Sequence, residues 1–337
     1  MSPLLDVRDL RVHFATDDGL VKAVDGVSFA VEPGRVLGIV GESGSGKSVS
    51  CLTIMGLTRA ANAKISGEAR FGERDLLALP DDELREIRGE EIGMVFQDPL
   101  SSLHPFYKVG RQLVEAIRVH HHDVSRAAAR QRAVELLGMV GIPEPGGRVD
   151  AYPHEFSGGM RQRAMIAMAL ANEPKLLIAD EPTTALDVTV QAQILELIAR
   201  LKDDLGMAVI VITHDLGVVA ETADDIAVMY AGRIVERAPT RTVFRAPEHP
   251  YTWGLLRSIP RLDAPRDSPL VPIPGRPPSL IHLPGGCSFH PRCAYVRERH
   301  KEVDPPLAPV PDDPAHQVAC LLDAETRRQL WRREATP

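Results

Sequence analysis

The chain has 337 residues, a formal net charge of −7, 44% hydrophobic residues and 4% aromatic residues. This length suits one large α/β domain with an appendage or two domains, and the acidic balance with few aromatic rings argues against nucleic acid as a partner. No apolar run approaches the roughly 18–20 residues of a membrane span, and the N-terminus lacks the basic and apolar regions of a signal peptide, so we expect a cytoplasmic protein that reaches a membrane only through a partner.

Residues 4–40 alternate apolar and polar side chains, which predicts β-strands. Phe14 shares a strand face with Leu10 and Val12. It is a candidate to stack on an adenine ring, although an ordinary place in the strand core fits the spacing nearly as well.

A phosphate-binding loop is predicted directly after the apolar run of residues 36–40. The stretch from Gly41 to Ser48 has the pattern G-x-x-x-x-G-K-S and precedes an apolar helical segment, residues 49–57. Glycines let the backbone wrap around phosphate oxygens, and the helix N-terminus faces the negative charge. Lys47 can reach the β- and γ-phosphates, and Ser48 can ligate Mg²⁺. The candidate binding residues are Gly41, Ser43, Gly44, Ser45, Gly46, Lys47 and Ser48.

Another strand is predicted over residues 92–96, and Gln97 begins the loop that follows it. Residues 106–141 are predicted to be helical because apolar residues recur at helical spacing. Ser157, Gly158 and Gly159 then precede the apolar helix of residues 164–171. They form a second helix start that can face a phosphate.

Two adjacent acids end a predicted strand that begins at Lys175 and continues with the apolar residues 176–179. In a protein with a phosphate-binding loop, an acid at such a strand end holds Mg²⁺, a role that fits Asp180. Glu181 is then the candidate base that polarises water for attack on the γ-phosphate. A solvated turn is the alternative, but the four residues before the acids are apolar.

An amphipathic helix over residues 190–205 and a buried strand over 208–213 come next, and the strand ends at His214. A histidine in this place is more often structural, but beside the two acids it can contact the γ-phosphate. Residues 226–235 predict a hairpin that turns at Ala231-Gly232.

Together these motifs resemble the ATP-binding subunit of an ABC transporter. The resemblance assigns Gln97 to the Q-loop, residues 156–162 to the signature, residues 176–180 to the Walker B strand, residues 185–187 to the D-loop and His214 to the switch position. It implies an α/β fold: a P-loop NTPase core of the ABC type over residues 1–97 and 157–238, with an antiparallel β subdomain, and a helical subdomain over 98–156. Gln97 is implied to touch nucleotide and Mg²⁺ beside Ser48 and Asp180.

The resemblance also implies partners. Two ATP-binding subunits, either two copies or a homologous pair, meet head to tail, so that the Ser157–Gly159 signature of one chain faces the ATP held by the other. Two membrane permease subunits and an extracytoplasmic substrate-binding protein complete such an importer. The chain is then peripheral, on the cytoplasmic face of the cell membrane.

The composition changes after about residue 238, since 18 of the 28 prolines lie from Pro239 onward, which predicts a loop-rich extension, residues 239–337. The stretches 249–256 and 286–293, with 96–103 in the core, resemble those of ATPases from dipeptide and oligopeptide permeases. We therefore expect an ATPase that powers peptide import. Nickel or sugar import is the alternative, because related importers share this extension. An exporter subunit or a non-transport ABC ATPase acting on DNA or ribosomes fits the chain less well.

The extension also carries Cys287, Cys293, His300 and Cys320. Peptide-permease relatives can carry a cysteine at the position of His300 and bind an iron–sulfur cluster. Three thiolates and an imidazole can hold a cluster or zinc, so we expect a metal here, an iron–sulfur cluster before zinc. Free thiols in a reducing cytosol are the alternative. Cys51, on the helix after the phosphate-binding loop, is expected to be a packing residue.

Overall fold

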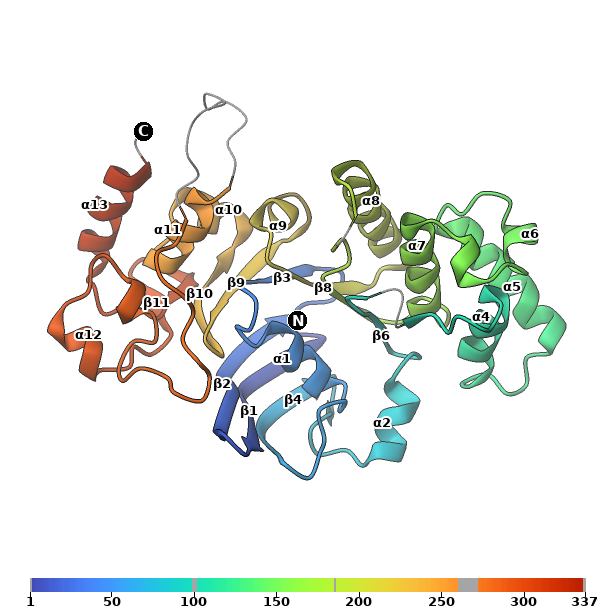
Figure 1. The fold of residues 1–337 in the computed structure, drawn as a ribbon, viewed down its shortest axis with the longest axis horizontal. Coiled ribbons are helices and arrows are strands. Elements are labelled where there is room, and N and C mark those ends of the chain that lie inside the picture. The colour runs from blue at the N-terminus through green and yellow to red at the C-terminus, as the bar shows by residue number, and fades with distance from the viewer. Residues whose placement is uncertain (1, 99–101, 185, 260–271, 336–337) are drawn as a thin grey trace. The chain divides into compact units, whose positions relative to one another are not determined.

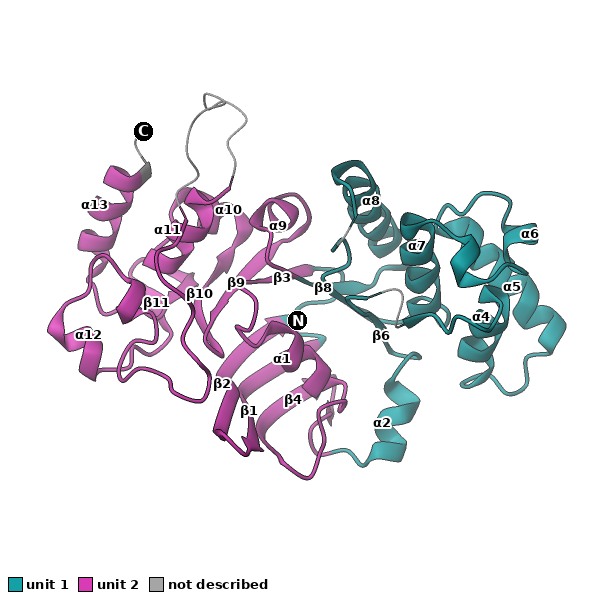
Figure 2. Cartoon of the chain, in the orientation of Figure 1, with its two compact units in different colours: residues 1–4, 31–35, 79–212 teal, residues 5–30, 36–78, 213–337 magenta. Residues whose placement is uncertain are grey.

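The computed structural model describes residues 2–98, 102–184, 186–259 and 272–335 (Figure 1). The chain divides into two compact units, which Figure 2 shows in different colours. Unit 1 comprises residues 1–4, 31–35 and 79–212, and unit 2 comprises residues 5–30, 36–78 and 213–337. The domain bounds expected from the sequence stay predictions.

A four-stranded sheet in unit 2 has the strand order β2-β1-β4-β5. Its strands are β1 (Leu5–Thr16), β2 (Gly19–Val31), β4 (Ala63–Phe71) and β5 (Arg74–Asp75). β1 pairs antiparallel with β4, as does β5. Leu10 and Val12 are fully buried, whereas Arg8 between the strand's buried residues is exposed. One face of this sheet therefore meets the core, as the alternation predicts.

The other paired strands of unit 2 include β3 (Val36–Val40), β9 (Asp225–Tyr230) and β10 (Arg233–Pro239). β3 is parallel to β9, and β9 is antiparallel to β10. All five residues of β3 are buried, which explains its unbroken apolar run. The turn between β9 and β10 consists of Ala231 and Gly232, whose φ angles of 49° and 80° suit a type I′ hairpin. The predicted hairpin is confirmed.

The C-terminal extension is loop-rich, as predicted, but it also adds strands to this part of unit 2. β12 (Asp313–Val318) pairs antiparallel with β10, where Val318 lies opposite Glu236, and β11 (Ala308–Val310) pairs with β12. Along the chain, helix α11 (Pro250–Arg257) precedes these two strands and helix α13 (Ala324–Ala335) follows them. β10 pairs with Gln317 and Val318 at the end of β12, and composition alone does not reveal such a long-range partner.

An aromatic cluster joins the extension to the end of β9. The ring centroids of Tyr230 and Tyr251 are 4.7 Å apart, and that of Phe289 lies 5.2 Å from Tyr230 and 5.4 Å from Tyr251. All three side chains are buried. Ring pairs at these distances contribute beyond the area they bury, so the extension and the strands of unit 2 share one core.

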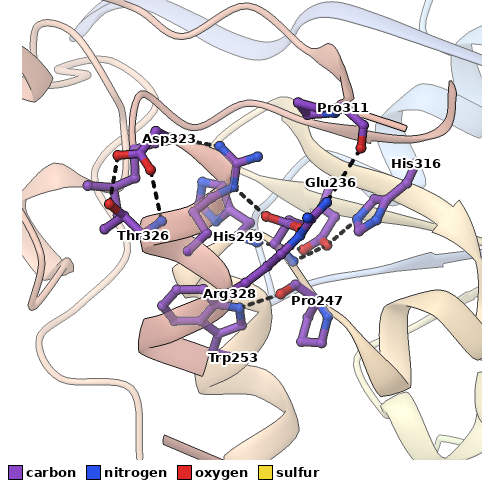
Figure 3. A network of polar contacts seen from close by, with 12 residues as sticks. Glu236, Pro247, His249, Trp253, Pro311, His316, Asp323, Thr326 and Arg328 are labelled. Atoms are coloured by element: carbon purple, nitrogen blue, oxygen red, sulfur yellow. Dashed lines mark hydrogen bonds and ion pairs between the residues drawn. The ribbon is translucent and has the colours of Figure 1, made fainter. Parts of the chain in front are cut away.

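A buried polar network ties the extension to β10 (Figure 3). The Glu236 carboxylate is fully buried and accepts hydrogen bonds from the backbone N–H groups of Glu248 and His249, at 2.6 and 3.0 Å. Nε2 of His316 lies 2.7 Å from the same carboxylate. Arg327 of α13 donates to Glu248 at 2.5 Å. The network gives every buried charge a partner, which is the condition for keeping charges inside a protein.

His249 makes the stability of this region depend on pH. Burial, helped by the charge of Arg327, lowers the pKa of His249 from 6.5 to about 3. Between these values the unfolded chain binds a proton that the folded chain does not, so stability falls as the pH falls below 6.5. We expect the free energy of unfolding of the wild type to decrease between pH 6 and pH 4 by about 1.4 kcal/mol per pH unit more than that of His249→Asn.

Urea unfolding at pH 7, 6, 5 and 4 measures this difference. Asn is a suitable replacement because His249 caps α11 by accepting from the N–H of Tyr251, and Asn caps helices in the same way. Parallel pH profiles for the two proteins would contradict the assignment.

Unit 1 contains the parallel strands β6 (Ile92–Val95), β7 (Leu176–Asp180) and β8 (Ala208–Thr213), the last of which ends at the unit's border. β7 pairs with both β6 and β8. Every residue of the three strands is buried. Because β6 and β7 are parallel, their carboxyl ends lie at the same edge, where Asp180 ends β7, Glu181 follows it and Gln97 comes shortly after β6.

Helices make up most of the rest of unit 1. The predicted helical region is confirmed by α4 (Val109–Arg118) and α5 (Arg126–Met139). Ser125 caps α5 by accepting from the N–H of Ala128 at 3.2 Å. The others are α2 (Asp81–Ile87), α6 (Pro145–Arg148), the 3₁₀ turn η1 (Pro153–Glu155), α7 (Gly158–Ala169) and α8 (Val188–Leu205).

The remaining helices belong to unit 2. They are α1 (Lys47–Ile54), α9 (Leu216–Thr222), α10 (Thr240–Arg245), the 3₁₀ turn η2 (His290–Arg292) and α12 (Glu298–Glu302). Cys51 in α1 is fully buried, which confirms its packing role. Across the described part of the chain, no helix combines the length and the apolar character that a membrane crossing requires.

Candidate functional site

The predicted phosphate-binding loop lies between β3 and α1 of unit 2, as its sequence pattern predicts. The Lys47 side chain is buried, and its Nζ donates to the carbonyl oxygens of Gly41 at 2.7 Å and Glu42 at 3.0 Å. The Ser45 hydroxyl is buried without a hydrogen-bond partner among the described residues. The ammonium group of Lys47 and the Ser45 hydroxyl are both groups that can bind a phosphate in this loop.

Gly46 is required by the backbone of this loop. Its φ is 99°, and an added Cβ would lie 2.3 Å from the carbonyl oxygen of Ala23. We expect Gly46→Ala to lower the free energy of unfolding by about 2 kcal/mol or more, because a left-handed alanine costs about 1–2 kcal/mol even without a clash. Chemical denaturation measures the change.

The matched control is Gly147→Ala in α6. Gly147 has no atom within 4 Å of an added Cβ and no positive φ. This exposed helical position should tolerate alanine without loss of stability. Equal effects at the two glycines would show that the crowding at Gly46 is unimportant.

At the end of β7 in unit 1, three side chains come together: the predicted Gln97 and Glu181, and Thr184. The Oε2 atom of Glu181 accepts from Nε2 of Gln97 at 3.0 Å and from the Thr184 hydroxyl at 2.8 Å. Asp180 is buried at the strand end. Glu181 has φ of 46°, an uncommon conformation for this residue type that recurs at functional sites. The carboxylate is held in one orientation and can accept a proton from a water molecule.

Thr184 was missed by sequence reasoning, although a hydroxyl three residues after a candidate base is a recognisable signal. The predicted D-loop lies beside it. Ala185 falls outside the described residues, and Leu186 is half-buried. Asp187 caps α8 by accepting from the N–H of Val190 at 3.0 Å.

The predicted signature begins α7 in unit 1. Ser157 is the N-cap, and its hydroxyl accepts from the N–H of Met160 at 3.3 Å. Ser157 and Gly158 are exposed and Gly159 is half-buried, while Phe156 before them is buried. The N-terminus of α7, a helix of 12 residues, presents backbone N–H groups and the positive end of the helix dipole. It can therefore face a phosphate supplied from outside the chain.

The two remaining candidates lie in unit 2. His214 is exposed directly after β8, next to Asp215, which caps α9. Phe14 on β1 is half-buried rather than a full core residue. The residues of the predicted site thus fall in both units. Unit 1 holds Gln97, Asp180, Glu181 and Ser157–Gly159, and unit 2 holds Phe14, His214 and the phosphate-binding loop.

The structure does not support the predicted metal site in the extension. Burial raises the pKa of the thiols, for Cys293 to about 11 and for Cys320 to about 12, and that of Cys287 also rises. Nδ1 of His300 accepts from the N–H of Arg297 at 2.9 Å. Among the residues that the structure describes, no three His, Cys, Asp or Glu side chains are grouped to hold a metal ion.

Two family models match this chain, one in the predicted ATPase core and one in the C-terminal extension. The model described as "ABC transporter" matches residues 24–184, and the model described as "Oligopeptide/dipeptide transporter, C-terminal region" matches residues 235–299. The fold and these motifs define an ATP-binding cassette of the ABC class. The likeness extends to a solved dimeric structure of the cassette MJ0796 in a post-hydrolysis state bound to ADP and Pi, at 29% identity and a TM-score of 0.63, over 70% of this chain and 99% of that one.

Curated relatives narrow the class. The chain is 52% identical to the oligopeptide transport ATP-binding protein OppD of Salmonella typhimurium over 96% of its own length and 94% of that protein. It is 54% identical to OppD of Mycobacterium tuberculosis over 95% of its own length, but it spans about half, 52%, of that longer relative. The chain belongs to the family of oligopeptide transport ATP-binding proteins.

Proposed function

We propose that the chain binds and hydrolyses ATP and thereby powers an importer of di- and oligopeptides. The observation that carries the proposal is the match to OppD of Salmonella typhimurium, 52% identical over 94% of that protein. The closed phosphate-binding loop around Lys47 and the oriented carboxylate of Glu181 support the enzymatic part. Both groups have the chemistry that phosphoryl transfer to water requires.

Each predicted residue has a proposed role. The loop from Gly41 to Ser48 binds the phosphates, with Lys47 as the cation, and Phe14 stacks on adenine. Ser48, Gln97 and Asp180 are the oxygen donors for Mg²⁺, which would neutralise charge on the β- and γ-phosphates. Glu181 takes the proton of the attacking water.

The proposed partners would contact site residues that are exposed in the single chain, among them Ser157, Gly158 and His214. A second ATP-binding subunit supplies its ATP to the helix start at Ser157–Gly159, and His214 senses the γ-phosphate. Two permease subunits and an extracytoplasmic substrate-binding protein complete the importer, so the chain acts at the cytoplasmic face of the cell membrane. ATP then closes the pair of subunits and hydrolysis releases it.

Uptake of a labelled tripeptide tests this function in cells that lack the native gene. Cells that carry the chain should accumulate the peptide, and cells that carry Glu181→Gln should not. Glu196→Gln is the matched control, because Glu196 is an exposed helical residue of α8. Unchanged peptide uptake in the Glu181→Gln cells would overturn peptide import, and nickel and sugar uptake by the same cells would then test the alternatives.

A further inference from the structure

An acidic residue in a phosphate-binding loop needs an explanation. Glu42 follows Gly41 directly, and a carboxylate beside ATP phosphates is repulsive. In unit 2 its two oxygens are held by Arg292, at 2.7 Å from Nη1 and 3.1 Å from Nη2. This bidentate ion pair fixes the orientation of the Glu42 carboxylate and also neutralises its charge. Arg292 belongs to the C-terminal extension, in the segment between Cys287 and Cys293.

The extension holds the backbone of Glu42 as well. The N–H of Glu42 donates to the hydroxyl of Tyr251 at 2.9 Å. Tyr251 is fully buried in α11, and burial raises the pKa of its hydroxyl far above the usual range, so it stays protonated. Because Nζ of Lys47 donates to the carbonyl of Glu42, the residue is held at its N–H, its carbonyl and its carboxylate.

Arg292 is itself fixed in place. It is only 7% exposed, and its Nε donates to the carbonyl of Pro274 at 2.8 Å. The guanidinium lies over the rings of Tyr230 and Phe289, 5.8 and 6.0 Å from their centroids. Burial opposes its charge, but the bonds to Glu42 and Tyr230 raise the pKa of Arg292 overall. A rigid and permanently charged partner is suited to positioning another residue.

We propose that Arg292 and Tyr251 are positioning residues for ATP binding, through which the C-terminal extension sets the affinity of the phosphate-binding loop. Arg292 neutralises and orients the Glu42 carboxylate, and Tyr251 holds the backbone amide of the same residue. Lys47 donates a hydrogen bond to the carbonyl of Glu42, so Glu42 alone links the contacts from the extension to the lysine of the phosphate-binding loop. The proposal rests on ATP binding by this loop, and it gives the extension a role in that binding.

A double-substitution cycle tests the role of Arg292. Binding of a fluorescent ATP analogue with Mg²⁺ is measured for the wild type, Arg292→Met, Glu42→Gln and the double variant. We expect Arg292→Met to weaken binding about tenfold, because it leaves the Glu42 charge uncompensated. In the Glu42→Gln background the same change should cost less than about threefold. An equal loss in both backgrounds, or no loss in either, would overturn the proposal.

Further variants separate positioning from folding. Arg327→Met is the matched control, because Arg327 is an equally buried arginine of the extension that pairs with Glu248, away from the loop. It should lower thermal stability and leave ATP affinity unchanged. Arg292→Lys keeps the charge and should restore part of the affinity lost in Arg292→Met. At saturating ATP the hydrolysis rate of Arg292→Met should approach that of the wild type, since Glu181 is untouched.

Tyr251→Phe keeps the test decisive if Arg292→Met fails to fold. It removes one hydroxyl and should weaken ATP binding about threefold to tenfold. Unchanged affinity in this variant would remove Tyr251 from the proposal and, if Arg292→Met does not fold, would overturn it. A wild-type protein that binds no MgATP would instead refute the proposed function, so the two failures are distinguishable.

Discussion

Glu181→Gln should bind MgATP as tightly as the wild type and hydrolyse it about 10²- to 10⁴-fold more slowly. Gln has the size of Glu and keeps one oxygen, which can still accept from Gln97 and the Thr184 hydroxyl as the carboxylate does. It cannot take a proton from water, and that is the role proposed for this side chain. Release of inorganic phosphate at saturating MgATP measures the rate, and titration with the fluorescent analogue measures binding.

Glu196→Gln carries the same chemical change on an exposed face of α8 and should keep the wild-type rate. The pair of variants therefore compares one carboxylate with another in the same unit. If Glu181→Gln kept more than about a tenth of the wild-type rate, another group would have to act as the base.

Lys47→Met should lose most of the affinity for MgATP, about 100-fold or more, because charge-assisted hydrogen bonds to phosphate are among the strongest in proteins. Lys47 is buried and its ammonium group bonds two carbonyls of its own loop. Met fills a similar volume without the charge, so the variant leaves these carbonyls and the phosphates without their cation. The same titration measures the loss.

The control for this change is Lys175→Met. Lys175 has a mostly exposed side chain and pairs with Glu91 at the surface of unit 1, where an ion pair contributes little. It should bind MgATP like the wild type. An affinity of Lys47→Met within tenfold of the wild-type value would argue against a phosphate contact by Lys47.

Local chemistry explains why much of the site was predictable. The phosphate-binding loop depends on residue types at fixed spacing, and its glycines, Lys47 and Ser48 are adjacent in sequence, so no long-range contact is needed to recognise it. The hairpin at Ala231-Gly232 follows for the same reason, since both φ angles are positive and the turn consists of two residues.

Pairing between distant residues was only partly predictable. The sequence shows that Gln97 and Glu181 each follow an apolar strand, but only the parallel pairing of β6 with β7 makes these ends neighbours. The hydrogen bond between the two side chains is a consequence of that pairing. Sheet order depends on contacts far apart in the chain, and strand patterns do not specify it.

The amino-acid sequence by itself determined the class of this protein, its phosphate-binding loop, the strand-end acids and the helical region, because each depends on short-range spacing. Tertiary structure alone decided which residues the extension contacts. Among the described residues it groups no three His, Cys, Asp or Glu side chains to hold a metal ion, which leaves the predicted metal site without support. It also placed Arg292 against Glu42, 250 residues away in the chain, because burial and long-range charge pairing arise only when distant segments pack together.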